Sequence, residues 1–291
     1  MSTTSRVGVI GLGIIGARVA KNLRKAGFDV YVWNRTPKEE PQFVQSPQVL
    51  AETCQVLQIF VANDAAILET IAKLRPALTP QHLLIAHSTI SPDTIKQMKA
   101  ELAPTGAHLI DAPFTGSKGA AEKGQLVYYV AADPIDLERA KPILEATSRH
   151  IVYLDHLGDA SLIKIATNLI TASIVQSLSE AIAITEKAGV NPEKLVEAIE
   201  YNACRSGVSD LKIQAILNRD FDPNFSLTNM LKDSRLALKL AEKLKVDLPV
   251  TKTVSQLLTR ADEKGWGWQD FAVVSELVRA ENAERGLRIA E

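Results

Sequence analysis

The sequence has few of the side chains that build metal sites and disulfide frameworks. It contains two cysteines, Cys54 and Cys204, which lie far apart and form no CxxC pair. Its five histidines show neither HExxH nor a comparable ligand spacing. The pattern gives no support for a bound metal and favours two reduced core thiols, as in a cytoplasmic protein.

An excess of charge of either sign is also missing. The chain carries 33 lysines and arginines against 34 aspartates and glutamates, a formal net charge of -1 at pH 7. We therefore expect neither nucleic acid nor a membrane as a partner, and any anion site must be local. The first residues, Met1–Arg6, lack the successive sections of a signal peptide, which again predicts a cytoplasmic protein.

Long apolar runs are absent as well. The longest, Ile165–Ser179, lies between Lys164 and Glu180 and contains several Ser, Thr and Asn residues. It is shorter than the roughly 18–20 residues that span a bilayer. This segment is predicted to be a buried helix of a soluble protein.

The chain of 291 residues divides into two patterns, which predict an α/β fold with two domains. Short branched, apolar runs alternate with helical patterns in residues 1–157, which is typical of a largely parallel, doubly wound sheet covered on both faces. Residues 158–291 show helical patterns alone. The predicted strands are Val7–Ile10, Asp29–Trp33, Val56–Val61, Leu83–His87, His108–Asp111 and Leu126–Ala131. The predicted helices are Ile14–Ala26, Ala65–Leu74, Pro92–Ala103, Asp159–Ala188, Pro192–Ala203, Asp233–Lys245, Pro249–Lys264 and Asp270–Ala280.

A glycine-rich turn follows the first predicted strand and reads Gly11, Leu12, Gly13, Ile14, Ile15, Gly16. In the Rossmann fold such glycines allow a tight turn, close approach of a pyrophosphate and close helix packing. The helix that follows presents free N–H groups to the phosphates. With a strand before it and a helix after it, this GxGxxG motif predicts a dinucleotide site.

The end of the second predicted strand indicates which dinucleotide binds. An NAD site usually has Asp or Glu there, bound to the ribose 2′-hydroxyl. This chain instead has Asn34, Arg35 and Thr36, and Asp29 lies at the opposite end of the strand. A cation and hydroxyl donors suit a 2′-phosphate, so NADP (NADPH) is the expected cofactor.

Two polar features outside this site are candidates for the chemistry. Lys164 precedes Asn168 by four residues, which places both on one face of an apolar helix. A lysine in such a helix is costly unless it is paired or functional. The second feature is the loop Asp111–Ala121, which follows a strand and offers hydroxyls and glycine-exposed N–H groups to a carbonyl oxygen or a carboxylate.

Together these motifs resemble those of the β-hydroxyacid dehydrogenases, in order and across essentially the whole chain. The resemblance rests on the glycine-rich turn, the Asp111–Lys118 loop, Gly158-Asp159-Ala160 followed by Lys164 and Asn168, and Lys232-Asp233. Within the family, Trp33–Thr36, Gly116–Lys118 and Lys232–Leu238 most resemble the glyoxylate/succinic semialdehyde reductases.

The resemblance implies a role for each matching residue. Lys164 would be the general acid that protonates the carbonyl oxygen, and Asn168 would orient it or the substrate. Thr115, Gly116 and Ser117 would hold a small carboxylic-acid aldehyde, with Thr115 also in the catalytic set. Further cofactor contacts fall on Ala62, Asn63, Thr89 and Lys232, and further substrate contacts on Phe225 and Asp233. The family's helical domain mediates dimers or tetramers, which predicts a homo-oligomer.

The sequence also departs from the family pattern and leaves alternatives open. Thr115 stands where serine is usual, residues 37–41 are proline-flanked where a helix is usual, and Arg205 either binds a carboxylate or faces water. The alternatives within the family are 3-hydroxyisobutyrate or tartronate semialdehyde chemistry. An imine reductase is disfavoured by the presence of Lys164, and a scaffold without catalysis by the intact pair of Lys164 and Asn168.

Overall fold

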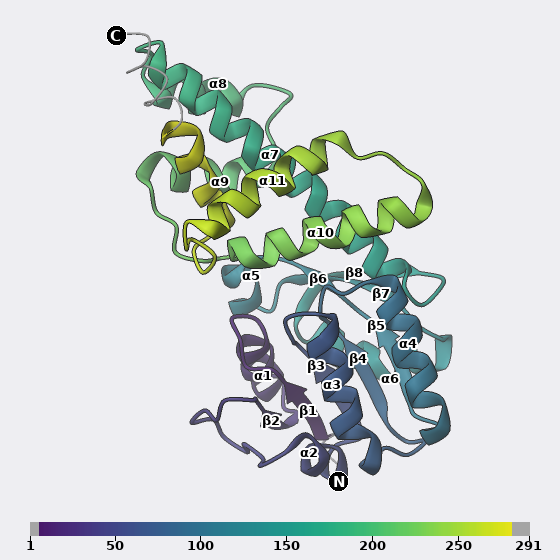
Figure 1. Cartoon of the computed structure of the whole chain (residues 1–291). Helices are drawn as coiled ribbons and strands as arrows, with labels where there is room; N and C mark the ends of the chain where they lie inside the picture. The colour runs from purple at the N-terminus through teal and green to yellow at the C-terminus, as the bar shows by residue number, and fades with distance from the viewer. Residues whose placement is uncertain (1–5, 281–291) are drawn as a thin grey trace. The chain divides into compact units, whose positions relative to one another are not determined.

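The computed structural model describes residues 6–280 of the chain, so the predictions made for the first five residues and for 281–291 lie outside the described part. The described residues form two compact units, which divide between Lys164 and Ile165. Helix α7 (Asp159–Lys187) begins in the first unit and continues in the second (Figure 1). The division therefore lies inside α7, whereas the sequence places it between residues 157 and 158.

The first unit is built on one mixed sheet with the order β2-β1-β3-β4-β5-β7-β6, in which β8 pairs with the opposite side of β7. Strands β1 to β5 run parallel, and β7 runs antiparallel to β5 and β6. The strands are β1 (Arg6–Ile10), β2 (Asp29–Trp33), β3 (Val56–Ile59), β4 (Leu83–Ala86), β5 (His108–Asp111), β6 (Phe114–Thr115), β7 (Leu126–Ala131) and β8 (Ser148–Leu154). The α/β expectation is confirmed, with two further strands, β6 and β8, that the sequence did not indicate.

The helices of the first unit connect these strands. Ser91 caps α4, because its side chain accepts the N–H of Thr94. Helices α2, α5 and α6 were not predicted. The α-helices are α1 (Gly16–Lys25), α2 (Pro47–Thr53), α3 (Asp64–Leu74), α4 (Pro92–Leu102), α5 (Lys118–Glu122) and α6 (Pro134–Glu145), with 3₁₀ turns η1 (Arg75–Ala77) and η2 (Ala103–Thr105).

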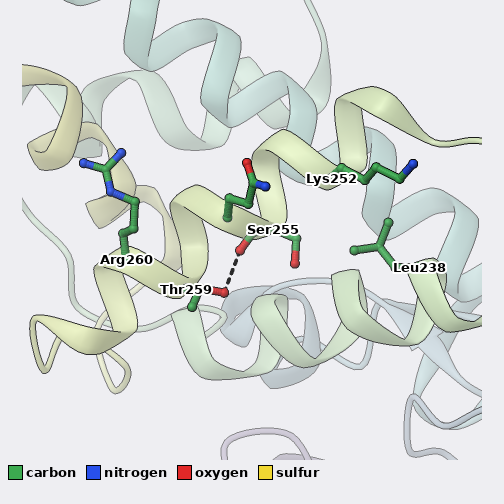
Figure 2. Close-up of a pocket in the computed structure, with 6 residues that line it drawn as sticks. Leu238, Lys252, Ser255, Thr259 and Arg260 are labelled. Carbon is green, nitrogen blue, oxygen red and sulfur yellow. Dashed lines mark hydrogen bonds between the residues drawn. The ribbon is translucent and has the colours of Figure 1, made fainter.

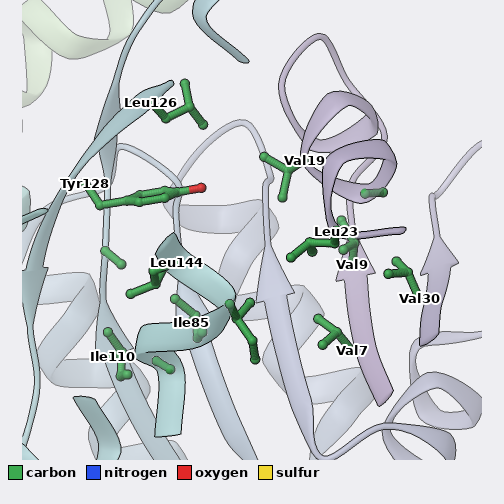
Figure 3. Close-up of a cluster of buried hydrophobic side chains, with 14 of the residues drawn as sticks. Val7, Val9, Val19, Leu23, Val30, Ile85, Ile110, Leu126, Tyr128 and Leu144 are labelled. Atoms are coloured by element: carbon green, nitrogen blue, oxygen red, sulfur yellow. The ribbon is translucent and has the colours of Figure 1, made fainter. Parts of the chain in front are cut away.

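Apolar side chains fill both faces of the sheet, as expected for parallel strands covered by helices. On β1, Val7 and Val9 belong to one buried cluster and Ile10 to another. Figure 3 shows the first cluster, in which Val19 and Leu23 of α1 lie over the strands. Because both faces are covered, ligands have access to the sheet at the ends of its strands.

The regular elements in the described residues of the second unit are helices, joined by loops. Its buried cluster includes Ala172, Val175, Leu178 and Ile182 of α7. The helices after α7 are α8 (Pro192–Glu200), α9 (Gly207–Asn218), α10 (Leu227–Leu244), α11 (Pro249–Glu263) and the 3₁₀ turn η3 (Phe271–Val273), followed by helical residues 274–280. Helix α9 was not predicted, and α10 begins six residues before the predicted start at Asp233.

Within residues 6–280, α7 alone has the length and hydropathy of a helix that could cross a membrane, a test that core helices of soluble proteins also pass. One face of α7 packs in the helical core, while Ile170 and Ile184 are 61% and 71% exposed. The expectation of a buried helix therefore holds for one face of α7. The expectation of two core thiols is wrong for Cys204, which is exposed, whereas Cys54 is buried.

Candidate active site

The glycine-rich turn has the geometry that a dinucleotide requires. Gly11 has a φ of +91°, and a Cβ there would lie 1.9 Å from the carbonyl oxygen of Phe60. A Cβ on Gly16 would lie 2.0 Å from the oxygen of Gly11, so this glycine allows α1 to approach the turn. A Cβ on Gly13 would meet nothing within 4 Å. The residues therefore fit a bound pyrophosphate, with open space beside Gly13 and an α1 N-terminus that Ile15 leaves without a side-chain cap.

Asn34 fastens the loop after β2 to the glycine-rich turn. Its Oδ1 accepts the N–H of Leu12 at 2.9 Å, and its Nδ2 donates to the oxygen of Thr36 at 2.7 Å. Both ends of the Asn34 amide are thus engaged within the protein, while Arg35 and Thr36 are exposed beside it. Asp29, at the other end of β2, lies 3.5 Å from Arg6.

Lys38 is a residue of this site that the sequence analysis missed. Its Nζ donates to the oxygen of Leu12 at 2.6 Å, which brings a second cation to the glycine-rich turn. The segment 37–41 that carries Lys38 forms no helix. The missing helix noted in the sequence is therefore replaced by an irregular loop that crosses back to the turn.

The next two strands end in the same region of the sheet edge. Asn63 caps α3, because its Oδ1 accepts the N–H of Ala66 at 2.9 Å, and Ala62 before it is exposed. After β4, the Ser88 hydroxyl accepts the N–H of Val61 at 2.9 Å, and Thr89 is half-buried. The cap thus occupies Oδ1 of the Asn63 side chain.

The loop that begins at Asp111 contains short elements of its own. Thr115 lies in β6 opposite Val127, and Gly116 has a φ of +137°. The hydroxyl of Ser117 caps the five-residue helix α5 by accepting the N–H of Ala120 at 3.4 Å. Thr115 is half-buried. The loop thus uses the Ser117 hydroxyl for structure.

Lys164 lies in the second turn of α7 and is 8% exposed. Its side chain therefore does not extend into solvent. Four positions further along the same helix, Asn168 is 6% exposed. Lys164 is thus a buried cation in an apolar helix, which is unusual unless the group is paired or functional.

In the second unit, Asn168 is held by a buried carboxylate. Its Nδ2 donates to Oδ2 of Asp233 at 2.5 Å, and Oδ1 of Asp233 lies 2.8 Å from Nζ of Lys232. A carboxylate accepts hydrogen bonds and cannot donate them, so the NH₂ of Asn168 faces Asp233 and its Oδ1 faces away. Asn168 therefore presents an acceptor on the side away from Asp233.

Phe225 is held by its backbone. Its N–H donates to Oδ2 of Asp270 at 3.2 Å, and its oxygen accepts the N–H of Phe271 at 3.0 Å. The two phenylalanine rings meet edge to face with centres 6.1 Å apart. Arg205, whose role the sequence left open, is exposed, and its Nε donates to both oxygens of Asp210.

A separate open pocket lies between α10 and α11 and has a volume of about 490 Å³. Figure 2 shows it, with the Thr259 hydroxyl donating to the oxygen of Ser255 at 2.8 Å. None of the predicted site residues lines it. The lining residues are Leu238, Lys252, Ser255, Gln256, Thr259 and Arg260. Residues 6–280 contain no cluster of three or more His, Cys, Asp or Glu side chains that could hold a metal ion.

Comparison with known proteins identifies the family. The model of the NAD binding domain of 6-phosphogluconate dehydrogenase matches residues 6–155. The model of the NAD-binding domain of NADP-dependent 3-hydroxyisobutyrate dehydrogenase matches residues 158–278. An Arabidopsis thaliana protein, glyoxylate/succinic semialdehyde reductase 2, chloroplastic, is 30% identical over 287 residues, which cover 95% of this chain and 80% of that protein. The chain belongs to the β-hydroxyacid dehydrogenase family.

Solved structures agree with this assignment at the level of the fold. The 3-hydroxyisobutyrate dehydrogenase of Salmonella typhimurium has a TM-score of 0.84 and 23% identity, over 94% of this chain and 99% of that one. The structure of Psf3 in complex with NADP⁺ and 2-OPP has a TM-score of 0.85 and 22% identity, over the same shares. This β-hydroxyacid dehydrogenase is thus an NAD(P)-dependent oxidoreductase acting on CH–OH groups, as the sequence motifs predict.

Proposed function

We propose that the chain reduces small aldehyde acids, such as glyoxylate and succinic semialdehyde, to hydroxy acids with NADPH. The observation that carries the proposal is the buried Lys164 on α7, in a chain that is 30% identical to a reductase named for these substrates. A buried lysine can supply the proton that accompanies hydride transfer to a carbonyl carbon.

The choice of NADPH rests on the charges beside the glycine-rich turn. Arg35 is exposed next to the loop that Asn34 fastens, and Lys38 contacts the same turn. Two cations and the hydroxyl of Thr36 suit a 2′-phosphate, which a carboxylate at the tip of β2 would repel. We also propose that Lys232 contacts NADPH.

In the proposed reaction, bound NADPH supplies the hydride. Lys164 donates a proton to the carbonyl oxygen, and the acceptor oxygen of Asn168, fixed by Asp233, orients the lysine or the substrate. Thr115 offers a hydroxyl, and Gly116 and Ser117 offer backbone N–H groups, to the substrate carboxylate. Phe225 and Asp233 complete the substrate contacts.

Two branches of the same family remain as alternative proposals, 3-hydroxyisobutyrate and tartronate semialdehyde chemistry. They use the same lysine and differ in the substrate side chain. An imine reductase is disfavoured because Lys164 is present and buried. Activity on methylmalonate or tartronate semialdehyde, with none on succinic semialdehyde, would move the proposal to these branches.

We further propose a cytoplasmic homodimer or homotetramer that associates through its helical unit, with neither nucleic acid nor a membrane as partner. Ile170, Ile184 and Val190 are each more than half exposed on or directly after α7. Exposed apolar side chains of this kind are typical of subunit interfaces. The balanced charge supports the absence of an electrostatic partner.

The cofactor part of the proposal is tested by steady-state kinetics with succinic semialdehyde and either NADPH or NADH. The native protein should prefer NADPH, and Arg35→Asp should lower kcat/KM for NADPH by at least about tenfold while sparing NADH, because a charge-assisted hydrogen bond is lost. The control is Arg149→Asp, which changes an exposed arginine on β8. Equal use of both cofactors by the native protein would contradict the proposal.

A further inference from the structure

Asp111 connects two elements to which the proposed function assigns different tasks. It is the last residue of β5 and the first of the loop that carries Thr115, and its side chain is fully buried. Its carboxylate reaches the start of α7, the helix that carries Lys164. Oδ2 accepts the N–H of Gly158 at 3.1 Å and the N–H of Ser161 at 3.0 Å, and Oδ1 accepts the Ser161 hydroxyl at 2.8 Å.

These bonds replace the usual cap of a helix. The first N–H groups of an α-helix have no partner within the helix and are normally satisfied by a side chain close in sequence. For α7 that side chain comes from β5, 47 and 50 positions away in the chain. A buried carboxylate at this end also interacts favourably with the helix dipole. The position of the first turn of α7 is thereby tied to the end of β5.

The charge state of Asp111 agrees with this arrangement. Burial raises the pKa of Asp111 to about 6, while the hydrogen bonds from Ser161 and Gly158 favour the ionised form and Asp159 opposes it. At neutral pH the carboxylate is therefore mostly ionised, and all three of its bonds can form.

We infer that Asp111 is a positioning residue for catalysis, which acts through Ser161 to fix the turn of α7 that places Lys164. The inference rests on the proposed role of Lys164 and adds a residue that has no contact with the reacting atoms. Lys164 follows Ser161 by three residues, less than one helical turn, so a shift of Ser161 moves the lysine with it. A misplacement of about 1 Å at a catalytic group can cost 10²-fold in rate.

The test compares Asp111→Asn, Ser161→Ala and Ser161→Thr with the native protein. Asparagine places an NH₂ group against N–H donors, alanine removes one bond, and threonine keeps the hydroxyl. We expect kcat to fall about 10²-fold for Asp111→Asn and about tenfold for Ser161→Ala, and to recover for Ser161→Thr. The dissociation constant for NADPH should stay within about threefold in each variant, because the glycine-rich turn is untouched.

A matched control separates positioning from general stability. Asp136 is also a buried carboxylate of the first unit, at 2% exposure, but it binds His108 and Arg139 and holds no predicted site residue. Asp136→Asn should lower the midpoint of thermal unfolding and leave kcat unchanged. If Asp111→Asn does not fold, the comparison of Ser161→Ala with Ser161→Thr decides the question.

Combination with Lys164→Ala distinguishes failure of the inference from failure of the proposed function. If Asp111 acts through Lys164, the double variant of Asp111→Asn and Lys164→Ala should be no slower than Lys164→Ala alone. A multiplicative loss in the double variant, or a native kcat for Asp111→Asn and Ser161→Ala, would overturn the inference. A native kcat for Lys164→Ala itself would instead overturn the proposed role of Lys164.

Discussion

Lys164 in the first unit and Lys212 in the second are equally buried, each 8% exposed. Nζ of Lys212 lies 2.7 Å from both carboxylate oxygens of Asp270 and 4.7 Å from the centre of the Phe271 ring. Lys164 instead follows a helix turn that is fastened to the sheet edge by Asp111, next to the loop that begins there. The two lysines thus share their burial, and the helix turn before Lys164 is tied to the end of β5.

Burial alone therefore does not distinguish the structural role of Lys212 from the catalytic role proposed for Lys164. Asp270, the partner of Lys212, also accepts the N–H groups of Asn224 and Phe225 and therefore joins α9 to the loop before α10. Lys212 and Asp270 thus form a hydrogen-bond network that fixes the backbone of this region. We interpret Lys164 instead as a group whose proton takes part in the reaction. Variants of the two lysines test whether their roles differ in this way.

The largest expected effect is on the turnover of Lys164→Ala. Loss of a general acid should lower kcat by roughly 10²–10⁴-fold with NADPH binding nearly unchanged. Stopped-flow measurement of hydride transfer and a separate titration with NADPH would check both statements. Near-normal hydride transfer would show that Lys164 is a structural lysine like Lys212.

The reverse pattern is expected for Lys212→Met. Removal of one partner from a buried ion pair leaves Asp270 uncompensated and should cost about 3–5 kcal/mol of unfolding free energy, measured by denaturant titration. The kcat of the folded fraction should fall far less than it does in Lys164→Ala.

An exposed ion pair provides the control for Lys212→Met. Lys194 and Glu197 lie 2.7 Å apart, with side chains 71% and 60% exposed. Lys194→Met should cost less than about 1 kcal/mol. A stable Lys212→Met variant that loses hydride transfer would reverse the assignment of the two lysines.

His87 extends the comparison to a buried base that is neutral. Its ring stacks on Phe60 with centres 4.4 Å apart, and burial lowers its pKa to about 3. The unfolded chain titrates near 6.5, so between these values the unfolded state binds more protons and stability falls as the pH is lowered. From pH 6.5 to pH 5 the loss of unfolding free energy amounts to about 1.6 kcal/mol, because the unfolded histidine is only half protonated at pH 6.5.

The effect of His87 is tested by comparing the pH dependence of unfolding free energy in the native protein and in His87→Gln. A comparison is needed because titration of Asp111 changes stability in the opposite direction. Its raised pKa makes the folded state bind more protons between about pH 4 and pH 6. His87→Gln keeps Asp111 and loses the histidine titration. The free energy of unfolding of the native protein should therefore fall more steeply below pH 6.5 than that of His87→Gln, and parallel curves would contradict the account.

Much of the first unit could be predicted from the sequence because its signals are local. Strands β1 and β2 follow from short apolar runs, and the turn between β1 and α1 follows from its three glycines. Strand β8 was missed because the exposed Arg149 and His150 interrupt its apolar pattern. Helix α6 was missed because Pro134 and Pro142 suggest a break, although Pro134 occupies the first helical turn.

Candidate site residues could be proposed from the sequence where they belong to a motif, but not where their contacts depend on distant partners. Lys164 and the glycine-rich turn are motif residues. Lys38 is one lysine in an irregular loop, and its contact with Leu12 follows from the path of that loop. Asp111 lies in a predicted motif, but its bonds to Gly158 and Ser161 depend on tertiary structure.

The central claim, reduction of small aldehyde acids, is tested most directly by kcat/KM with NADPH for two matched pairs of aldehydes. Succinic semialdehyde and butanal share a four-carbon chain, and glyoxylate and acetaldehyde share a two-carbon chain, so each pair differs in its carboxylate. Loss of that group leaves the donors around Thr115 and Ser117 unpaired and should lower kcat/KM by at least about tenfold in each pair. Equal kcat/KM for the acid and the uncharged aldehyde in both pairs would contradict the account.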